Sequence, residues 1–386
     1  MYDSRLDELA RVLVRYSTRV KRGDIVRIRM PTVAEPLALA VYKEVILARG
    51  LPVVRLVPEE CQELLVRHGS PPQLAYVSPF DLAEVQAVNV DIIAWASRNT
   101  RAMSNADPQK QAAVNKARKP ILDTYLARMA RRGKDKLRWV GTQYPCQASA
   151  QDAEMSLTEY ADFVFSAGML HLRDPVGAWR KIHETQQRLV DFLNRTQEVH
   201  CVTPNGTDIR FGVRGRRWIN CDGANNFPDG EVFTAPIESA TEGEIRFDFP
   251  AVYQGREVTD VRLRFREGKV VDADASKGKE FLFQMMDQDD GGRIVGELAF
   301  GTNYAITRFS RNTLFDEKIG GTMHMALGAA YPEAGGKNQS ALHWDMVCDL
   351  RRGGCIEVDG RPISKGGRFL NPSWPQPGKS GKHSSR

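Results

Sequence analysis

The chain has 386 residues, of which 42% are hydrophobic and 26% are charged, and its formal net charge is +6. Such values are typical of a globular protein with two domains or one large domain. No apolar run approaches the roughly 18 residues that span a bilayer, which excludes a membrane-spanning helix. Six cysteines without a CxxC pair argue against a thiolate zinc site. No apolar segment follows the charged N-terminus, so we expect a cytoplasmic protein with no membrane partner.

Positive charge is concentrated between residues 110 and 138, where ten basic residues stand against two acidic ones. A basic surface of this kind can bind anions or nucleic acid. It is more often a solvated helical face beside a dimer contact. No nucleic-acid-binding motif accompanies the charge, so we do not expect a nucleic-acid partner. A non-enzymatic anion- or nucleic-acid-binding protein is the alternative from another functional class.

The first half of the chain alternates strand-like apolar runs with amphipathic helical stretches. A strand predicted at residues 24–30 is followed by a helical stretch over about 34–49. Further strands are predicted at 52–57, 90–96 and 137–142. The alternation predicts an α/β domain over residues 1–195 with a small, mostly parallel sheet, which closes with a long helix after Pro175. No glycine-rich phosphate-binding motif follows these strands.

The second half has a different sequence pattern. Short alternating segments separated by turn sequences, such as Pro228-Asp229-Gly230, predict a mainly antiparallel β (α+β) domain over residues 196–370. We expect this C-terminal domain to bind metal. Residues 371–386 are rich in proline, serine, glycine and lysine, and they predict a disordered basic tail.

Isolated acids and histidines inside apolar runs are the chemical signal of this half. Glu297 lies in the run 294–300, and His343 and Asp345 lie two apart in the run 341–347, so both point to one face of a strand. Glu231 opens a third strand-like segment. A buried carboxylate is costly unless a cation meets it, and a shared metal ion is the economical answer. The alternatives are a Glu297 paired with Arg293 or Arg308, and a simple His–Asp pair.

His324 and Tyr331 are seven residues apart in a further apolar segment. If residues 323–331 are helical, the two side chains share a face, and the phenol could hydrogen-bond an oxyanion. An amphipathic helix that merely buries both residues is the alternative. Asp316 and Glu317 are further acids that could reach the same cavity. The remaining histidines have no comparable setting and are expected to be surface or ordinary structural residues: His68, His171, His183, His200 and His383.

Read in order, these segments resemble the thermophilic aminopeptidase family, the aminopeptidase T/aminopeptidase S group of metallopeptidases. The resemblance covers most of the chain, because RLDELA (5–10) and KRGD (21–24) also fit it. The specific words are PDGEVFTAP (228–236), GELA (296–299), NTLFDE (312–317), HMALGAAY (324–331) and HWD (343–345). The chain departs from the family pattern between Glu317 and His324, where residues 318–323 make a longer approach.

The resemblance implies a homodimeric enzyme that releases N-terminal amino acids from peptides with a free N-terminus. It implies two divalent ions (Zn, Co or Mn) that share and activate a bridging water. A metal-dependent hydrolase of another amide or ester on the same scaffold remains an alternative. Carried over by position, the implied metal ligands are Glu231, Glu297, Glu317, His324, His343 and Asp345. The implied catalytic residues are Glu297 or Glu317, as proton shuttle, and Tyr331, as oxyanion donor.

Overall fold

The computed structural model describes residues 3–378 and divides into two compact units. One comprises Met1–Val176 and Gly223–Pro228, and the other comprises Gly177–Asp222 and Asp229–Arg386. The long helix α10 (Pro175–Leu193) therefore falls almost wholly in the second unit, whereas we expected it to close the first domain. Among the described residues no helix is long and apolar enough to cross a membrane.

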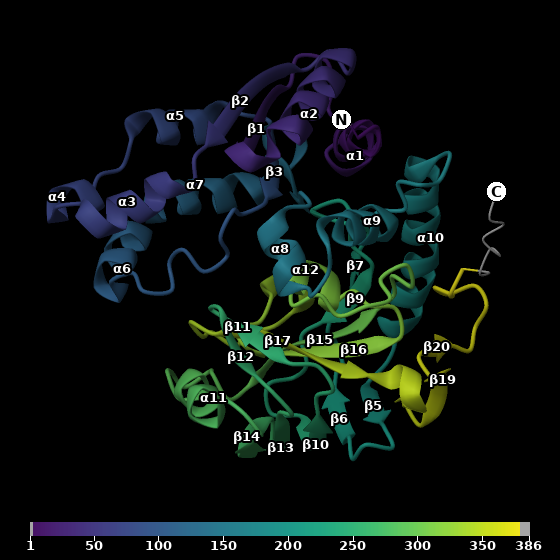
Figure 1. Ribbon diagram of the computed structural model, residues 1–386. Helices are drawn as coiled ribbons and strands as arrows, with labels where there is room; N and C mark the ends of the chain where they lie inside the picture. Colours follow the sequence, from purple (N-terminus) through teal and green to yellow (C-terminus); the bar gives the residue numbers. More distant parts are fainter. Residues whose placement is uncertain (1–2, 379–386) are drawn as a thin grey trace. The chain divides into compact units, whose positions relative to one another are not determined.

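The first unit is built on a five-stranded sheet in the order β2-β1-β3-β4-β8, and every pairing in it is parallel (Figure 1). The four predicted strands are confirmed within two residues, and β8 is an addition. The strands are β1 (Ile25–Pro31), β2 (Leu51–Val57), β3 (Val90–Trp95), β4 (Arg138–Gln143) and β8 (Asn226–Phe227). The α-helices are α1 (Arg5–Val12), α2 (Glu35–Leu47), α3 (Glu60–His68), α4 (Pro71–Leu74), α5 (Pro79–Ala87), α6 (Pro108–Ala117), α7 (Lys119–Met129), α8 (Gln147–Asp152) and α9 (Leu157–Ala167).

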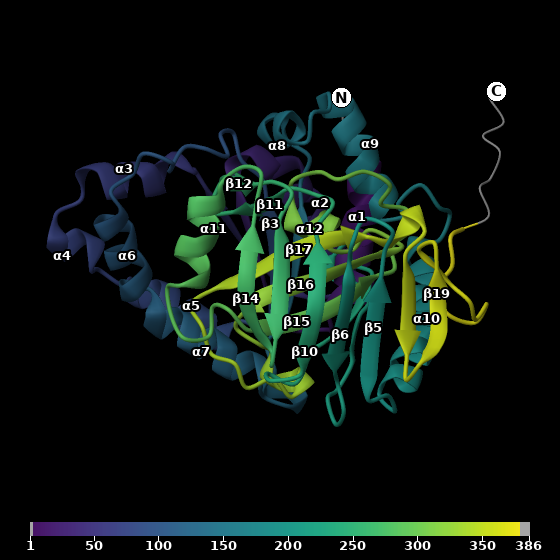
Figure 2. The same ribbon diagram turned by 90° about the horizontal axis from the view of Figure 1, so that it is seen from below.

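The second unit packs two antiparallel sheets face to face, as expected for the C-terminal half. An eight-stranded sheet in the order β14-β13-β10-β6-β5-β18-β19-β20 lies over a five-stranded sheet in the order β17-β16-β15-β9-β7 (Figure 2). The first sheet contains β5 (Glu198–Val202), β6 (Asp208–Gly212), β10 (Thr241–Arg246), β13 (Arg262–Arg266), β14 (Lys269–Asp274), β18 (Cys355–Val358), β19 (Arg361–Lys365) and β20 (Arg368–Phe369). The second contains β7 (Ile219–Cys221), β9 (Glu231–Thr234), β15 (Val295–Gly301), β16 (Thr322–Gly328) and β17 (His343–Asp349). A hairpin, β11 (Ala251–Tyr253) and β12 (Arg256–Val258), and two helices, α11 (Lys279–Met286) and α12 (Thr313–Asp316), complete the unit.

Alternation along the five-stranded sheet separates an apolar core face from a polar face. Leu298, Phe300, Met323 and Met325 belong to the core cluster of buried residues that also takes in the inner face of the eight-stranded sheet. Their sequence neighbours therefore point to the opposite face. This second face of the sheet carries the chemistry described below.

Two expectations are corrected here. The segment after Met323 is not a helix, because Thr322–Gly328 forms β16 between β15 and β17 with all seven residues buried. The tail is ordered as far as it is described, because Trp374 is only 7% exposed and packs its ring 4.9 Å from that of Phe192. Residues 379–386, with His383, lie outside the described part of the chain.

Candidate metal centre

Four adjacent strands bring five of the predicted ligands to one face of the five-stranded sheet. Glu231 opens β9, Glu297 lies in β15, His324 lies in β16, and His343 and Asp345 begin β17. Glu231, Glu297 and His324 are each at most 5% exposed. The sheet thus collects residues that are far apart in sequence.

Small residues on the same face leave space between these ligands. Ala326 of β16 lies opposite Glu297 on one side and opposite Asp345 on the other. Gly301 of β15 lies opposite Glu231. Because directly paired residues of antiparallel strands point to the same side, a larger side chain at Ala326 would fill the room between Glu297 and Asp345. At Gly301 a side chain would instead collide with the backbone carbonyl of Ile319.

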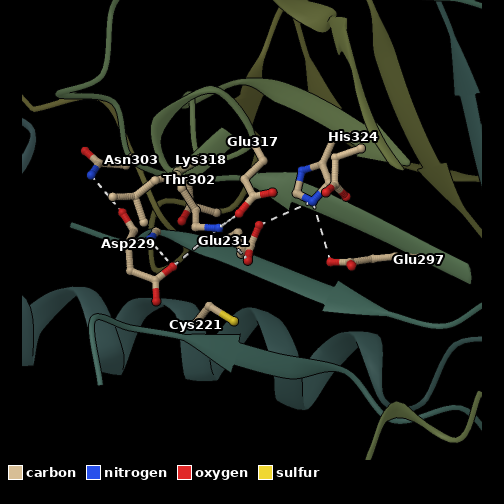
Figure 3. Close-up of polar contacts among 12 residues, drawn as sticks. Cys221, Asp229, Glu231, Glu297, Thr302, Asn303, Glu317, Lys318 and His324 are labelled. Carbon is tan, nitrogen blue, oxygen red and sulfur yellow. Dashed lines mark hydrogen bonds and ion pairs between the residues drawn. The ribbon is translucent and has the colours of Figure 1, made fainter. Parts of the chain in front are cut away.

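Glu297 joins two of the groups of ligand atoms that could share an ion, and Glu317, His324 and Asp345 form another. Oε1 of Glu297 lies 3.5 Å from Nε2 of His324, which lies 3.3 Å from Oε2 of Glu231. Oε2 of Glu297 lies 3.3 Å from Nε2 of His343, which lies 3.6 Å from Oδ1 of Asp345. Such separations suit ligand atoms that each lie about 2.1 Å from a common ion. Glu297 therefore offers one oxygen to each group. Figure 3 shows its contact with His324.

The residues present fit a metal ion. Oε2 of Glu231, Nε2 of His324 and Oδ1 of Asp345 are buried and have no hydrogen-bond partner among the described residues. Buried polar atoms are ordinarily paired, so three unpaired atoms that face one another need a further partner. Carboxylate oxygens and imidazole nitrogens are the donors that divalent first-row metals take.

The pKa values of the two histidines reflect the negative charge that surrounds them. Burial opposes a charged imidazole, yet the carboxylates of Glu297 and Glu231 raise the pKa of His324 to about 9. Asp345 and Glu297 likewise raise the pKa of His343 to about 10, against the effect of burial. Burial would raise the pKa of Glu297, but the two histidines lower it to about 2. The face is therefore built to stabilise a cation.

Lys318 is a functional residue that the sequence analysis missed. Its side chain is fully buried, and its Nζ donates to Oε1 of Glu231 at 2.9 Å and to Oε1 of Glu317. Oδ1 of Asp229 lies 3.9 Å away (Figure 3). Glu317, at the end of α12, thus reaches the centre together with the lysine that follows it. A lone lysine in a glycine-rich segment gives no sequence signal of burial.

Long-range pairing fixes this lysine. The backbone N–H of Asn303 donates to the carbonyl of Lys318 at 3.0 Å, and Asn303 forms an isolated parallel bridge with Ile319. Nδ2 of Asn303 also donates to the carbonyl of Asp229 at 2.8 Å. The loop after β15 therefore ties the lysine segment to the turn that precedes Glu231.

Gln186, the polar break in the apolar face of α10, supports the centre from behind. Its side chain is fully buried, and Nε2 donates to the carbonyls of Cys221 and Glu231 at 2.9 and 3.1 Å. Oε1 accepts from the hydroxyl of Thr302 at 2.8 Å. The break thus marks a buried amide that joins the helix to β7 and β9.

A small pocket opens beside the ligands. Its lining includes Asp345 and Glu317, with apolar walls from Val252 and Phe309. Asp316 also lines it, as expected, and burial raises the pKa of this acid to about 7. Arg311 lines the pocket as well, so its polar lining holds three acids and one arginine, and the rest of the lining is mainly apolar.

Tyr331 also stands beside the ligands. Its ring lies edge-on to His343, with the two ring centroids 5.2 Å apart, and packs against Phe233 at the same distance. Burial and the nearby carboxylates, Glu297 first, raise the pKa of the Tyr331 phenol well above its ordinary value, so it remains an O–H donor. Tyr331 thus lies beside the centre without the helix that we expected to carry it there.

Among the described residues, neither arginine considered as a partner of Glu297 pairs with it, whereas His343 and Asp345 do lie within ion-pair distance of each other. Arg293 pairs with Asp287 rather than with Glu297. His183 and His200 bind carboxylates outside the centre, in keeping with ordinary structural roles. One member of the basic cluster 110–138 has a structural role, because the buried Arg128 donates hydrogen bonds to the carbonyls of Val85 and Val88.

The chain matches a known protein family and several named relatives. The model of the thermophilic metalloprotease family (M29) matches residues 2–369. The chain is 27% identical to Aminopeptidase 2 of Geobacillus stearothermophilus over 95% of this chain and 98% of that one. It is 31% identical to Aminopeptidase T of Thermus aquaticus over 54% of this chain and 58% of that one.

Two solved structures share the fold. Wild-type AmpT from Thermus thermophilus aligns with a TM-score of 0.82 at 23% identity, over 96% of this chain and all of that one. The 2,5-dihydroxypyridine dioxygenase of Pseudomonas putida KT2440 aligns with a TM-score of 0.61 at 15% identity, over 95% and 97%. At these identities the likeness concerns the fold alone.

Proposed function

This chain belongs to the thermophilic metalloprotease family M29, and we propose that it is a metal-dependent aminopeptidase that releases N-terminal amino acids from peptides. Relatives that match it are named aminopeptidases. The observation that carries the proposal is the set of five ligand side chains on one sheet face, with buried atoms that lack a partner.

Two groups of ligands suit two divalent ions. Glu231, Glu297 and His324 would hold one ion, and Glu297, His343 and Asp345 would hold the other. Carboxylates and imidazoles accept Zn, Co or Mn, so the donor set leaves these three candidates. A divalent ion supplies Lewis-acid polarisation of a carbonyl and lowers the pKa of water toward neutrality.

The residues around the ligands divide the remaining tasks. Both oxygens of Glu297 face histidines, which suits a bridging ligand rather than a proton shuttle. Glu317 lines the pocket and keeps one oxygen beyond its bond to Lys318, so we assign it the transfer of a proton from water to the leaving amine. The Tyr331 hydroxyl would donate to the oxyanion that forms when water adds to the scissile carbonyl.

Selectivity for a free N-terminus follows from charge. Asp316, Glu317 and Asp345 outnumber Arg311 in the pocket lining and would attract the α-ammonium group of a peptide, whereas an acetylated end carries no charge. The apolar walls at Val252 and Phe309 would receive the first side chain. Peptides with a free N-terminus are therefore the proposed substrates.

We also propose a homodimer. Apolar side chains are exposed on α2 and on β2, the end strand of its sheet, including Leu39 (63% exposed), Leu47 (59%) and Leu51 (56%). An exposed apolar patch beside an open sheet edge suits a protein interface. Sedimentation velocity would test it, since a monomer at micromolar concentration contradicts the proposal.

We also propose a cytoplasmic location. All six cysteines are free thiols, which supports it.

Hydrolysis of leucine p-nitroanilide by chelator-stripped protein, titrated with Zn²⁺, Co²⁺ or Mn²⁺, tests the activity. We expect turnover to require metal, to fail on the N-acetylated substrate, and to fall about 100-fold or more in Glu297→Gln. Glu184→Gln, on the exposed side of α10, is the matched control. Full activity of Glu297→Gln would overturn the site, and turnover of amides or esters without a free amine would favour a different hydrolase.

A further inference from the structure

The cation already present in the centre is Lys318. Its ammonium is fully buried and lies among three carboxylates, those of Glu231, Glu317 and Asp229. Hydrogen bonds to Glu231 and Glu317 hold this ammonium in place.

This ammonium is attached to only one of the two ligand groups. It takes Oε1 of Glu231, whose Oε2 faces Nε2 of His324. Among the described residues, no lysine or arginine pairs with Glu297 or Asp345, which face His343 in the other group. The two ligand groups therefore differ in that a ligand carboxylate is bonded to an ammonium in only one of them.

We propose that Lys318 makes the two ion positions unequal, so that the position at Glu231 and His324 binds a divalent ion more weakly than the position at Glu297, His343 and Asp345. This inference rests on the metal centre of the proposed function and adds a positioning residue to it. An ammonium hydrogen-bonded to Glu231 competes with a metal ion for that carboxylate, so an ion at this position must displace or share the bond. At limiting metal the protein then holds one ion per chain.

The position of Lys318, on which the difference between the two ion positions depends, is fixed by buried contacts. Lys318 is held by Asn303 from its backbone, and its Nζ is held by two carboxylates, so the ammonium cannot leave without breaking a buried network. In exchange, the lysine keeps Glu231 and Glu317 paired when no metal is bound. At the weaker position the Lys318 ammonium is therefore already bonded to the carboxylates that a metal ion would use.

Equilibrium dialysis of chelator-stripped protein against buffered Zn²⁺, with bound metal counted by mass spectrometry, tests the proposal without any peptide. The wild type should bind two ions in steps separated by about 100-fold or more in dissociation constant, or one ion only. Asp345→Asn should remove the tighter step and Glu231→Gln the weaker one. Two equal steps in the wild type would overturn the proposal.

Variants of the lysine separate charge from packing. Lys318→Gln and Lys318→Met remove the charge, and either should bring the two steps at least tenfold closer by strengthening the weaker one. Lys318→Arg keeps the charge and should retain the separation, as should the control Lys365→Gln on β19. An unchanged separation in folded Lys318→Gln or Lys318→Met, judged by circular dichroism, refutes the inference. Unequal metal binding without peptide hydrolysis would instead refute only the proposed function.

Discussion

Loading the metal-free centre with divalent ions should release about two protons per chain at neutral pH, because both histidines hold a proton when no ion is present. The pKa values of His324 and His343 are about 9 and about 10 in the metal-free protein, so both rings are almost fully charged at pH 7. A metal ion binds only the neutral imidazole. Each ion therefore displaces one histidine proton.

The sign of the pH dependence follows directly. Raising the pH toward 9 removes these protons in advance and strengthens metal binding, whereas lowering the pH weakens it. Between pH 6 and 8 the logarithm of each apparent association constant should rise by about one per pH unit.

Isothermal titration calorimetry in two buffers of different ionisation enthalpy counts the released protons. The difference in observed heat, divided by the difference in buffer enthalpy, should give about one proton for each bound ion at pH 7. His200→Gln, which alters a histidine outside the centre, should leave the count unchanged. Heats that do not depend on the buffer would show that the histidines are neutral without metal and would refute the electrostatic reasoning.

Three further substitutions probe the architecture. Ala326→Leu should fill the space between the ligands of β15 and β17 and abolish metal binding measured by dialysis, although no ligand is removed; normal binding would contradict the register argument. Gln186→Leu should lower the free energy of unfolding by about 1–3 kcal/mol, measured by urea denaturation, because it leaves buried carbonyls unpaired; Glu184→Leu on the same helix should change it little. Trp374→Ala should lower the same free energy by about 3 kcal/mol, and an unchanged urea midpoint would show that the C-terminal segment does not contribute to the core.

The parallel sheet and the ligand strands were predictable because their signals are local. Each of the four predicted strands of the first unit is a compact apolar run, and Glu297 and the His343–Asp345 pair stand out against apolar neighbours. Strand β8 has two residues and no periodicity to detect. The run around His324 is apolar on both sides, and such a run reads equally as a buried strand or as a helix.

Other features depend on distant contacts and left no local trace. The burial of Lys318 requires Asn303, and the order of the C-terminal segment requires Trp374 to find Phe192. Gln186 was visible only as an interruption of an apolar face, because its partners lie on β7 and β9. In each case the decisive neighbour lies far along the chain.

The route of the chain between Asp222 and Asp229 limits how the protein can be dissected. Residues Gly223–Pro228 leave the second unit, add β8 beside β4, and return immediately before Glu231. A single protease cut between Val176 and Gly177 would therefore leave the two products fastened together through β8. An excised fragment beginning at Gly177 would carry Phe227 without the sheet that buries it. Truncation therefore cannot isolate the unit that carries the ligands. Its residues are better tested by point substitutions in the full chain.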